Sequence, residues 1–239
     1  MDEVTRSHSG IAAFVRREWP HWLLIVALFV ASAWAWNRVT LPIPTHWNIR
    51  GEVDGHGGRF EGLLLVPLIA VGLYALLLVL PRIDPARANY ASFTGAYTVI
   101  RATFALLTAG LHAVLLATAL GYPVDAGRWI PAGVGLMFVV LGSVLGKVRP
   151  NYFVGVRTPW TLASAKSWEQ THRAGGRVFV LAGLGMVLAA LLMQPWFFAA
   201  VGLLSGGALV WLLYYSYAVW RTDPDRVPVT GTLPPREGR

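Results

Sequence analysis

The chain has 239 residues, of which 55% are hydrophobic and 13% are charged, and it carries a formal net charge of +8. Because a soluble domain carries about a quarter charged residues, this composition excludes an ordinary soluble domain and favours a membrane protein. The count of zero Cys excludes disulfides and cysteine ligands. The basic residues flank apolar runs, so we assign them to contact with anionic membrane lipid and expect no direct contact with nucleic acid.

Six apolar stretches are each long enough to cross a bilayer, which takes about 20 residues. We expect spans at roughly 20–38, 62–80, 98–120, 129–147, 177–194 and 196–220. The predicted fold class is therefore all-α, a polytopic integral membrane bundle of six transmembrane helices. Lys and Arg number 15 on the side of the chain termini and 4 on the other side. The positive-inside rule then places both termini in the cytoplasm.

The N-terminal region, 1–19, is predicted to be cytoplasmic, with a polar, mobile start and a short interfacial helix over 10–19. Residues 20–120 hold the first three spans and an external loop, 39–61. The third span contains Arg101, which we expect to extend toward the headgroups, and His112, near mid-bilayer. His112 is interpreted as hydrogen-bonded to a neighbouring helix, with a proton relay or ligand role as the alternative. The six predicted spans contain no Asp or Glu, which argues against an ion-coupled transporter.

The external loop reads LPIPTHWNIRGEVDGHGGRF, 41–60, and its Pro and Gly residues predict a structured hairpin. Its candidate partner-binding residues are His46, Trp47, Asn48 and Asp54. Two imidazoles and a carboxylate can hold zinc, which makes His46, Asp54 and His56 weak metal candidates. Their spacing matches no established metal motif, so the hairpin is the favoured interpretation and no cofactor is expected.

The region 121–220 contains three spans in which small residues recur four apart, which lets helices approach closely in lipid. These pairs are Gly142 with Gly146, Gly185 with Ala189, and Gly202 with Gly206. We expect the fourth, fifth and sixth spans to pack together through them, and a homodimer is the alternative use of such a face. The tail 221–239 is rich in Pro and charge, which predicts disorder.

The cytoplasmic loop 147–177 contains Pro150 and Pro159, which break it into pieces. We predict a helix capped by Thr161 or Ser164 that runs to Ala174, lies on the membrane surface and ends at Gly175-Gly176. Polar and aromatic side chains gather here as candidate ligand-binding or partner-binding residues: Asn151, Arg157, Thr158, Trp160, Trp168, His172 and Arg173. Arg149, Arg157 and Arg173 can clamp a phosphate or carboxylate, or hold lipid headgroups.

Both loops together resemble the SdpI family of bacterial multispanning membrane proteins. The external loop matches a pattern of that family, P..IP.H.N..G..D..G, through Pro42, Ile43, Pro44, His46, Asn48, Gly51, Asp54 and Gly57. The end of the fourth span and the cytoplasmic loop match a second pattern, from the C-terminal part of that family, G...GK..PN...G.RTPWTL.S...W..TH..GG, through Gly142, Gly146, Lys147, Pro150, Asn151, Gly155, Arg157, Thr158, Pro159, Trp160, Thr161, Leu162, Ser164, Trp168, Thr171, His172, Gly175 and Gly176. His56 departs from the first pattern, so a metal role for it would not be a family property.

The resemblance implies an immunity protein of the bacterial cytoplasmic membrane that protects against a secreted antimicrobial toxin. It also implies that such a protein can hold a soluble transcriptional repressor at the membrane. The alternative function is a membrane-embedded enzyme or a transporter of lipids or small molecules that uses the 147–177 cluster. The sequence shows no HExxH motif, phosphate-binding Gly loop or evident nucleophile–base pair, so an enzyme is the less favoured interpretation and no catalytic residue is assigned.

Overall fold

The computed structural model describes residues 3–48 and 50–229, with side chains from Arg16 onward. The structure is 74% helical. Over these residues it contains six helices that are long and apolar enough to cross a membrane. The protein is therefore a multi-pass membrane protein, as the composition predicts. The chain divides into two compact units, one formed by 1–77 with 101–133 and the other by 78–100 with 134–239.

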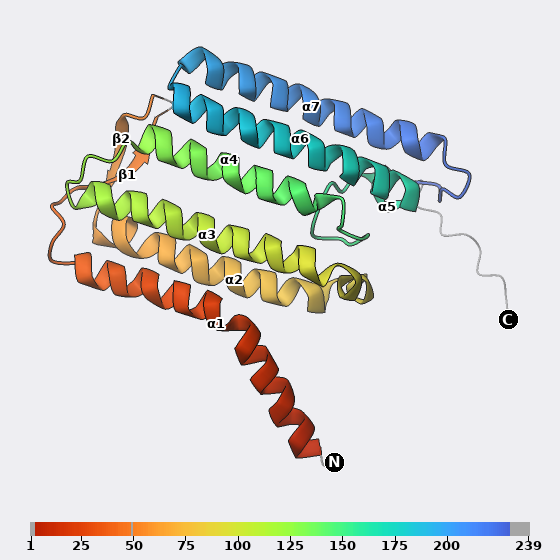
Figure 1. Cartoon of the computed structure of the whole chain (residues 1–239), viewed down its shortest axis with the longest axis horizontal. Coiled ribbons are helices and arrows are strands. Elements are labelled where there is room, and N and C mark those ends of the chain that lie inside the picture. The colour runs from red at the N-terminus through yellow and green to blue at the C-terminus, as the bar shows by residue number, and fades with distance from the viewer. Residues whose placement is uncertain (1–2, 49, 230–239) are drawn as a thin grey trace. The chain divides into compact units, whose positions relative to one another are not determined.

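Seven α-helices and one two-stranded sheet make up the described chain (Figure 1). The sheet is a departure from the all-α prediction, although it is confined to one short hairpin. A π-helical turn, Phe60–Leu64, precedes α2, and a 3₁₀ segment, Arg87–Phe93, precedes α3. The helices are α1 (Glu3–Ala35), α2 (Leu65–Ile83), α3 (Thr94–Ala119), α4 (Ala126–Leu145), α5 (Pro159–Leu162), α6 (Ala165–Leu192) and α7 (Pro195–Arg221).

The N-terminal region is not a mobile tail followed by a separate interfacial helix. From Glu3 onward it is the first part of α1, which continues without interruption through the first span. The helix contains Pro20, and Figure 1 shows a bend in α1. Because proline removes one backbone hydrogen bond and crowds the preceding turn, it commonly kinks a helix without ending it.

The external loop forms an antiparallel hairpin of β1 (Ile43–Trp47) and β2 (Val53–Gly57). Asn48 shapes its tip, because the side-chain oxygen accepts the backbone N–H groups of Arg50 at 2.8 Å and Glu52 at 3.1 Å. Gly51 has a φ of 78°, a left-handed conformation that glycine adopts without strain. The predicted hairpin is therefore confirmed.

A buried isoleucine fixes the hairpin to the helices of its own unit. Ile43 is fully buried in a cluster that includes Ala35 of α1, Leu63 of the π-helical turn and Leu115 of α3. A Cβ atom at Gly62 would lie 2.6 Å from Ile43 Cγ2. The absence of a side chain at this glycine therefore lets the hairpin close against the start of α2.

The predicted helix end at Gly175-Gly176 is wrong, because α6 runs through both glycines. Ser164 is its N-cap, as predicted, and the hydroxyl of Ser164 accepts the backbone N–H of Ser167 at 2.8 Å. A Cβ atom at Gly176 would lie 2.7 Å from the carbonyl oxygen of Gly142 on α4. The glycines thus permit close contact between two helices, and this packing outweighs their low helix propensity.

Small residues on the other predicted faces differ in their surroundings. A Cβ atom at Gly185 would lie 3.2 Å from Val201 of α7, so this face packs inside the unit. Gly202 and Gly206 have nothing within 4 Å of such an atom. The predicted packing among α4, α6 and α7 is therefore confirmed for Gly142 and Gly185, while the described chain leaves open space at Gly202 and Gly206.

The chain beyond α7 returns to the start of α6. The backbone N–H of Val227 donates to the carbonyl oxygen of Ala163 at 2.9 Å, and the indole of Trp220 donates to the carbonyl oxygen of Val227 at 3.2 Å. These bonds fix the part of the predicted disordered tail that the structure describes. Residues 230–239 lie outside the described chain, as do residues 1–2.

Candidate functional site

The hairpin displays charged pairs whose members remain exposed. The Nδ1 atom of His46 lies 2.5 Å from Oδ1 of Asp54, with side-chain exposures of 70% and 43%. Arg50 Nε lies 3.1 Å from Glu52 Oε2. The side-chain amide of Asn48 donates to Glu52 at 2.9 Å, and this bond is the main reason that the pKa of Glu52 lies below its usual range. The surface of these side chains is therefore accessible to a partner.

The three weak metal candidates do not come together. His46 and Asp54 form a pair, whereas His56 lies opposite Pro44 in the strand register. Within residues 3–48 and 50–229, no group of three His, Asp or Glu side chains is placed to share a metal ion. The binding of a partner by the exposed pairs of the hairpin, residues 43–57, stays a prediction.

Asn151 organises the first turn of the 147–177 segment from within. Its side-chain oxygen accepts the backbone N–H groups of Phe153 at 2.9 Å and Val154 at 2.6 Å. Its amide donates to the carbonyl oxygens of Arg149 at 2.8 Å and Val154 at 3.0 Å. All the hydrogen bonds of this amide group described here therefore go to the backbone of the loop and stabilise its turn.

Asp84, at the end of α2, ties the loop to the rest of the second unit. This buried carboxylate accepts the hydroxyl of Tyr90 at 3.0 Å and the backbone N–H groups of Tyr152 at 3.1 Å and Ala86 at 2.7 Å. Asn89 adds a bond to the carbonyl oxygen of Pro150 at 2.7 Å. No local sequence signal indicates this anchor, because Asp84 lies 68 residues from Tyr152.

His172 is fully buried, and both of its ring nitrogens have partners. Nε2 lies 3.0 Å from the backbone N–H of Val156 and must accept from it, so Nδ1 carries the proton and donates to the carbonyl oxygen of Trp168 at 2.8 Å. The rings of Trp168 and His172 stack with centroids 4.0 Å apart. Gly155 makes this arrangement possible, since a Cβ atom there would lie 2.2 Å from Nε2.

Two further contacts join the segment to α7 and to the turn that follows it. Thr158 and Thr161 form a reciprocal capping box at α5, and the hydroxyl of Thr158 lies 3.1 Å from that of Ser216. The hydroxyl of Ser164 donates to Asp223 at 2.5 Å, and this bond is the main reason that the pKa of Asp223 lies below its usual range. The segment is therefore folded onto the helices, and the expectation of a surface helix is wrong for it.

The remaining candidates of this segment face outward. Arg157 donates to the carbonyl oxygen of Tyr152 at 2.8 Å, and Arg173 pairs with Glu169 at 2.5 Å, both with exposed side chains. Trp160 is half-buried against the ring of Tyr217. Of the seven predicted residues, Asn151, Thr158, Trp168 and His172 are buried and engaged internally, whereas these three retain accessible surface. Their contact with a ligand remains a prediction.

The structure corrects the expectation for Arg101. Its guanidinium is buried and pairs with the fully buried carboxylate of Glu18, with one contact at 3.0 Å between Nη1 and Oε1. Glu18 lies inside the part of α1 that is apolar enough to cross a membrane, Arg16–Ala35, so the expectation of spans without a carboxylate is also wrong. The sequence signal for this pair is the position of Arg101, seven residues inside a helix, because a buried charge needs a partner.

His112 has the predicted interhelical bond, with Nε2 3.0 Å from the Ser32 hydroxyl.

Comparison with known proteins gives two family matches. Residues 147–215 match the SdpI/YfhL protein family, and residues 23–71 match a domain of unknown function, DUF1648. The chain is 34% identical over 68 residues to immunity protein SdpI of Bacillus subtilis (strain 168). These aligned residues make up 28% of this chain and 33% of that protein. The match thus spans a third of the length of the relative. No solved structure matches the chain. Residues 147–215, which contain the internally bonded segment described above, are therefore similar to the SdpI/YfhL protein family.

Proposed function

We propose that this protein is an immunity protein of the bacterial cytoplasmic membrane that confers resistance to a secreted antimicrobial toxin. The observation that carries the proposal is the 34% identity to immunity protein SdpI, together with the family match over residues 147–215. The six apolar helices fit a protein that acts within the membrane against a toxin arriving from outside. The positive-inside distribution of Lys and Arg supports cytoplasmic termini and an external hairpin.

Within this function, the hairpin is the surface that meets the toxin. Its charged side chains bond to one another across no more than eight residues and stay exposed. The exposed apolar side chains of Val53 and Phe60 lie on and beside it. A mixture of exposed charge and apolar area suits protein recognition, because the charges orient a partner and the apolar area adds affinity.

A survival assay tests the proposal. The protein is expressed in a sensitive bacterium that is challenged with the antimicrobial protein encoded nearest its gene. We expect the parent to raise the lethal dose at least tenfold and a His46→Ala/Asp54→Ala variant to lose this protection. Because the pair is exposed and local, the variant should accumulate in the membrane at the parent level.

The matched control is a Glu169→Ala/Arg173→Ala variant, which removes an exposed acid–base pair at α6. We expect it to protect as well as the parent. Equal protection by the hairpin variant would reject the hairpin as the toxin contact. A parent that gives no protection against this toxin would reject the proposed immunity to it.

A second role, retention of a soluble transcriptional repressor at the membrane, is supported by the exposed basic side chains of the 147–177 segment. Lys147, Arg149, Arg157, Lys166, Arg173 and Arg177 are all exposed. An acidic surface of a regulator would be attracted to them, and the attraction would weaken with salt. Co-purification of the repressor encoded beside the gene, at 50 mM and then at 500 mM salt (about a threefold change in screening length), would test this role.

A further inference from the structure

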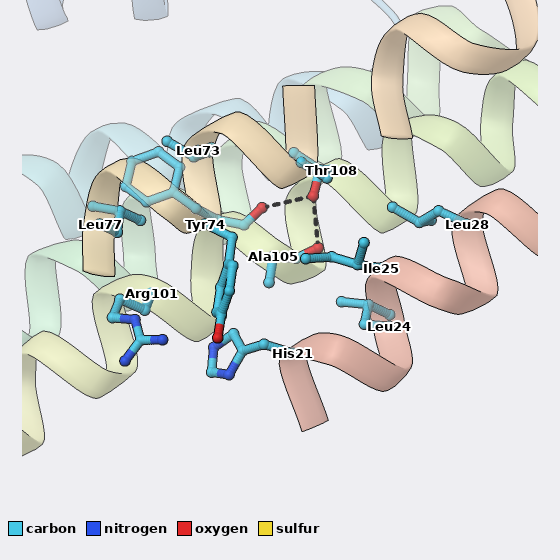
Figure 2. A pocket seen from close by; sticks show the side chains of 12 residues that line it. His21, Leu24, Ile25, Leu28, Leu73, Tyr74, Leu77, Arg101, Ala105 and Thr108 are labelled. Atoms are coloured by element: carbon cyan, nitrogen blue, oxygen red, sulfur yellow. Dashed lines mark hydrogen bonds between the residues drawn. The ribbon is translucent and has the colours of Figure 1, made fainter. Parts of the chain in front are cut away.

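A small cavity lies among α1, α2 and α3 of the first unit (Figure 2). Its volume is about 20 Å³, which is enough for about one water molecule. Most of its lining is apolar and includes Leu24, Leu73 and Ala105. Four polar side chains also face it: His21, Tyr74, Arg101 and Thr108. A cavity with only apolar walls would stay dry, so these polar groups decide what it holds.

The carboxylate of Glu18 next to the cavity is already saturated. Arg101 donates to both of its oxygens, Arg17 donates to Oε1 at 3.0 Å, and the hydroxyl of Tyr74 lies 3.4 Å from Oε2. Tyr74 in turn accepts the indole N–H of Trp22 at 2.6 Å. The hydroxyl of Thr108 is bonded to carbonyl oxygens of its own helix, at 3.1 and 2.9 Å. These groups therefore have protein partners.

His21 and Arg101 do not complete their hydrogen bonds within the described chain. Both ring nitrogens of His21 and the Nε atom of Arg101 are buried without a hydrogen-bond partner there. Nδ1 of His21 lies 3.8 Å from Oε2 of Glu18, which is beyond hydrogen-bonding distance. Leaving such groups unsatisfied inside a membrane protein is costly, so a ligand that bonds to them is favoured.

The chemistry of the unpaired atoms defines the ligand. The Nε–H group of arginine can only donate, so it requires an acceptor. A neutral imidazole has one nitrogen that accepts and therefore requires a donor. A single molecule that satisfies both must donate and accept hydrogen bonds, and the cavity limits it to the size of water.

We propose that the cavity is a binding site for one water molecule, which accepts the Nε–H of Arg101 and donates to an imidazole nitrogen of His21. The water completes a polar chain from α1 to α3 beside the Glu18–Arg101 pair. It thereby holds the imidazole of His21 in place between the helices. This site is independent of the proposed toxin recognition by the hairpin.

Water-edited solid-state NMR tests the site, with ¹⁵N-histidine in the full-length protein in lipid bilayers. His172 is the internal comparator, because it is fully buried and both of its nitrogens have protein partners. We expect magnetisation from water to reach the ring of His21 at least threefold faster than that of His172. Loss of one signal in a His21→Phe variant assigns the resonance. Equal transfer rates for the two rings would overturn the proposal.

A cavity-filling variant separates a bound water from water that reaches His21 from outside the helices. Ala105→Leu places a larger side chain in the cavity, whereas Gly110→Leu extends the same helix into open space and serves as the control. We expect the fast transfer to be lost in Ala105→Leu and kept in Gly110→Leu. Fast transfer that persists in Ala105→Leu would overturn the site. If Ala105→Leu does not fold, Ala105→Val provides the same comparison.

Discussion

The hairpin and the 147–177 segment use polar residues in opposite ways. In the hairpin, the side-chain bonds join residues two to eight positions apart, as in Arg50–Glu52 and His46–Asp54. In the segment, local bonds such as those of Asn151 are joined by bonds between residues 16, 58 and 68 positions apart, through His172, Thr158 and Asp84. Long-range bonds among buried groups hold the fold, whereas local bonds among exposed groups leave side chains available to a partner. The longer sequence motif therefore marks packing, and the shorter one marks the better candidate for recognition.

Gly155→Ala gives the largest expected effect and tests whether the segment is a folded core. The residue has a φ of 112°, where a Cβ atom costs about 1–3 kcal/mol. That atom would also lie 2.2 Å from Nε2 of the buried His172. We expect a loss on the order of 5 kcal/mol, or failure to fold, because the ring has no space to move. The yield of monodisperse protein in detergent and its unfolding temperature measure the effect.

Gly121→Ala is the control for this substitution. Gly121 also has a positive φ, of 83°, but a Cβ atom there would meet nothing within 4 Å. We expect only the conformational cost, about 1–2 kcal/mol. If both variants lost the same stability, the contact of Gly155 with His172 would have no energetic importance.

Replacing histidines in the two regions sharpens the comparison. His172→Phe keeps an aromatic ring next to Trp168 but leaves the N–H of Val156 unpaired and removes the side-chain bond to the carbonyl oxygen of Trp168, which keeps its bond within α6. An unsatisfied buried N–H costs about 1–3 kcal/mol and a lost hydrogen bond about 1 kcal/mol, so we expect a loss of about 3 kcal/mol. His46→Phe, on the exposed hairpin, should change stability by less than about 0.5 kcal/mol. Chemical unfolding in mild detergent measures both, and equal losses would contradict the assigned roles.

Gly142→Ala, at the contact between α4 and α6, has the next largest expected effect on stability. A Cβ atom at Gly142 would lie 2.6 Å from the carbonyl oxygen of Gly176. We expect Gly142→Ala to destabilise the protein by about 2 kcal/mol, since the two helices must separate to admit the methyl group. Gly202→Ala, with open space around it, should leave the unfolding temperature unchanged. If Gly202→Leu lowered the molecular mass of the protein in detergent, the predicted homodimer would use this face.

Much of the architecture could be predicted from the sequence, because the bilayer imposes a length and a composition on each span. The N-cap at Ser164 was also predictable, since capping is a local interaction. The pairing of Glu18 with Arg101 was not, because it joins residues 83 positions apart. The continuity of α6 through Gly175-Gly176 depends on the contact with Gly142 on another helix. The burial of His172 likewise depends on a loop that folds back onto it, so the sequence alone predicts a binding residue where the structure shows internal hydrogen bonds.

Acid titration of the hairpin tip gives the smallest expected effect. The bond from Asn48 and the charge of Arg50 hold the pKa of Glu52 below its usual value of 4.5. The carboxylate therefore contributes to the turn above about pH 4.5, and this contribution is lost as the pH falls through the lower folded pKa. We expect the exchange-sensitive NMR signal of the Asn48 side-chain amide to broaden as the pH falls through the folded pKa of Glu52. The unfolding temperature of the whole protein should not change. Glu52→Gln should remove this pH dependence. Broadening that persists in Glu52→Gln would assign the transition to another group and leave the hairpin tip held by the backbone bonds of Asn48 alone.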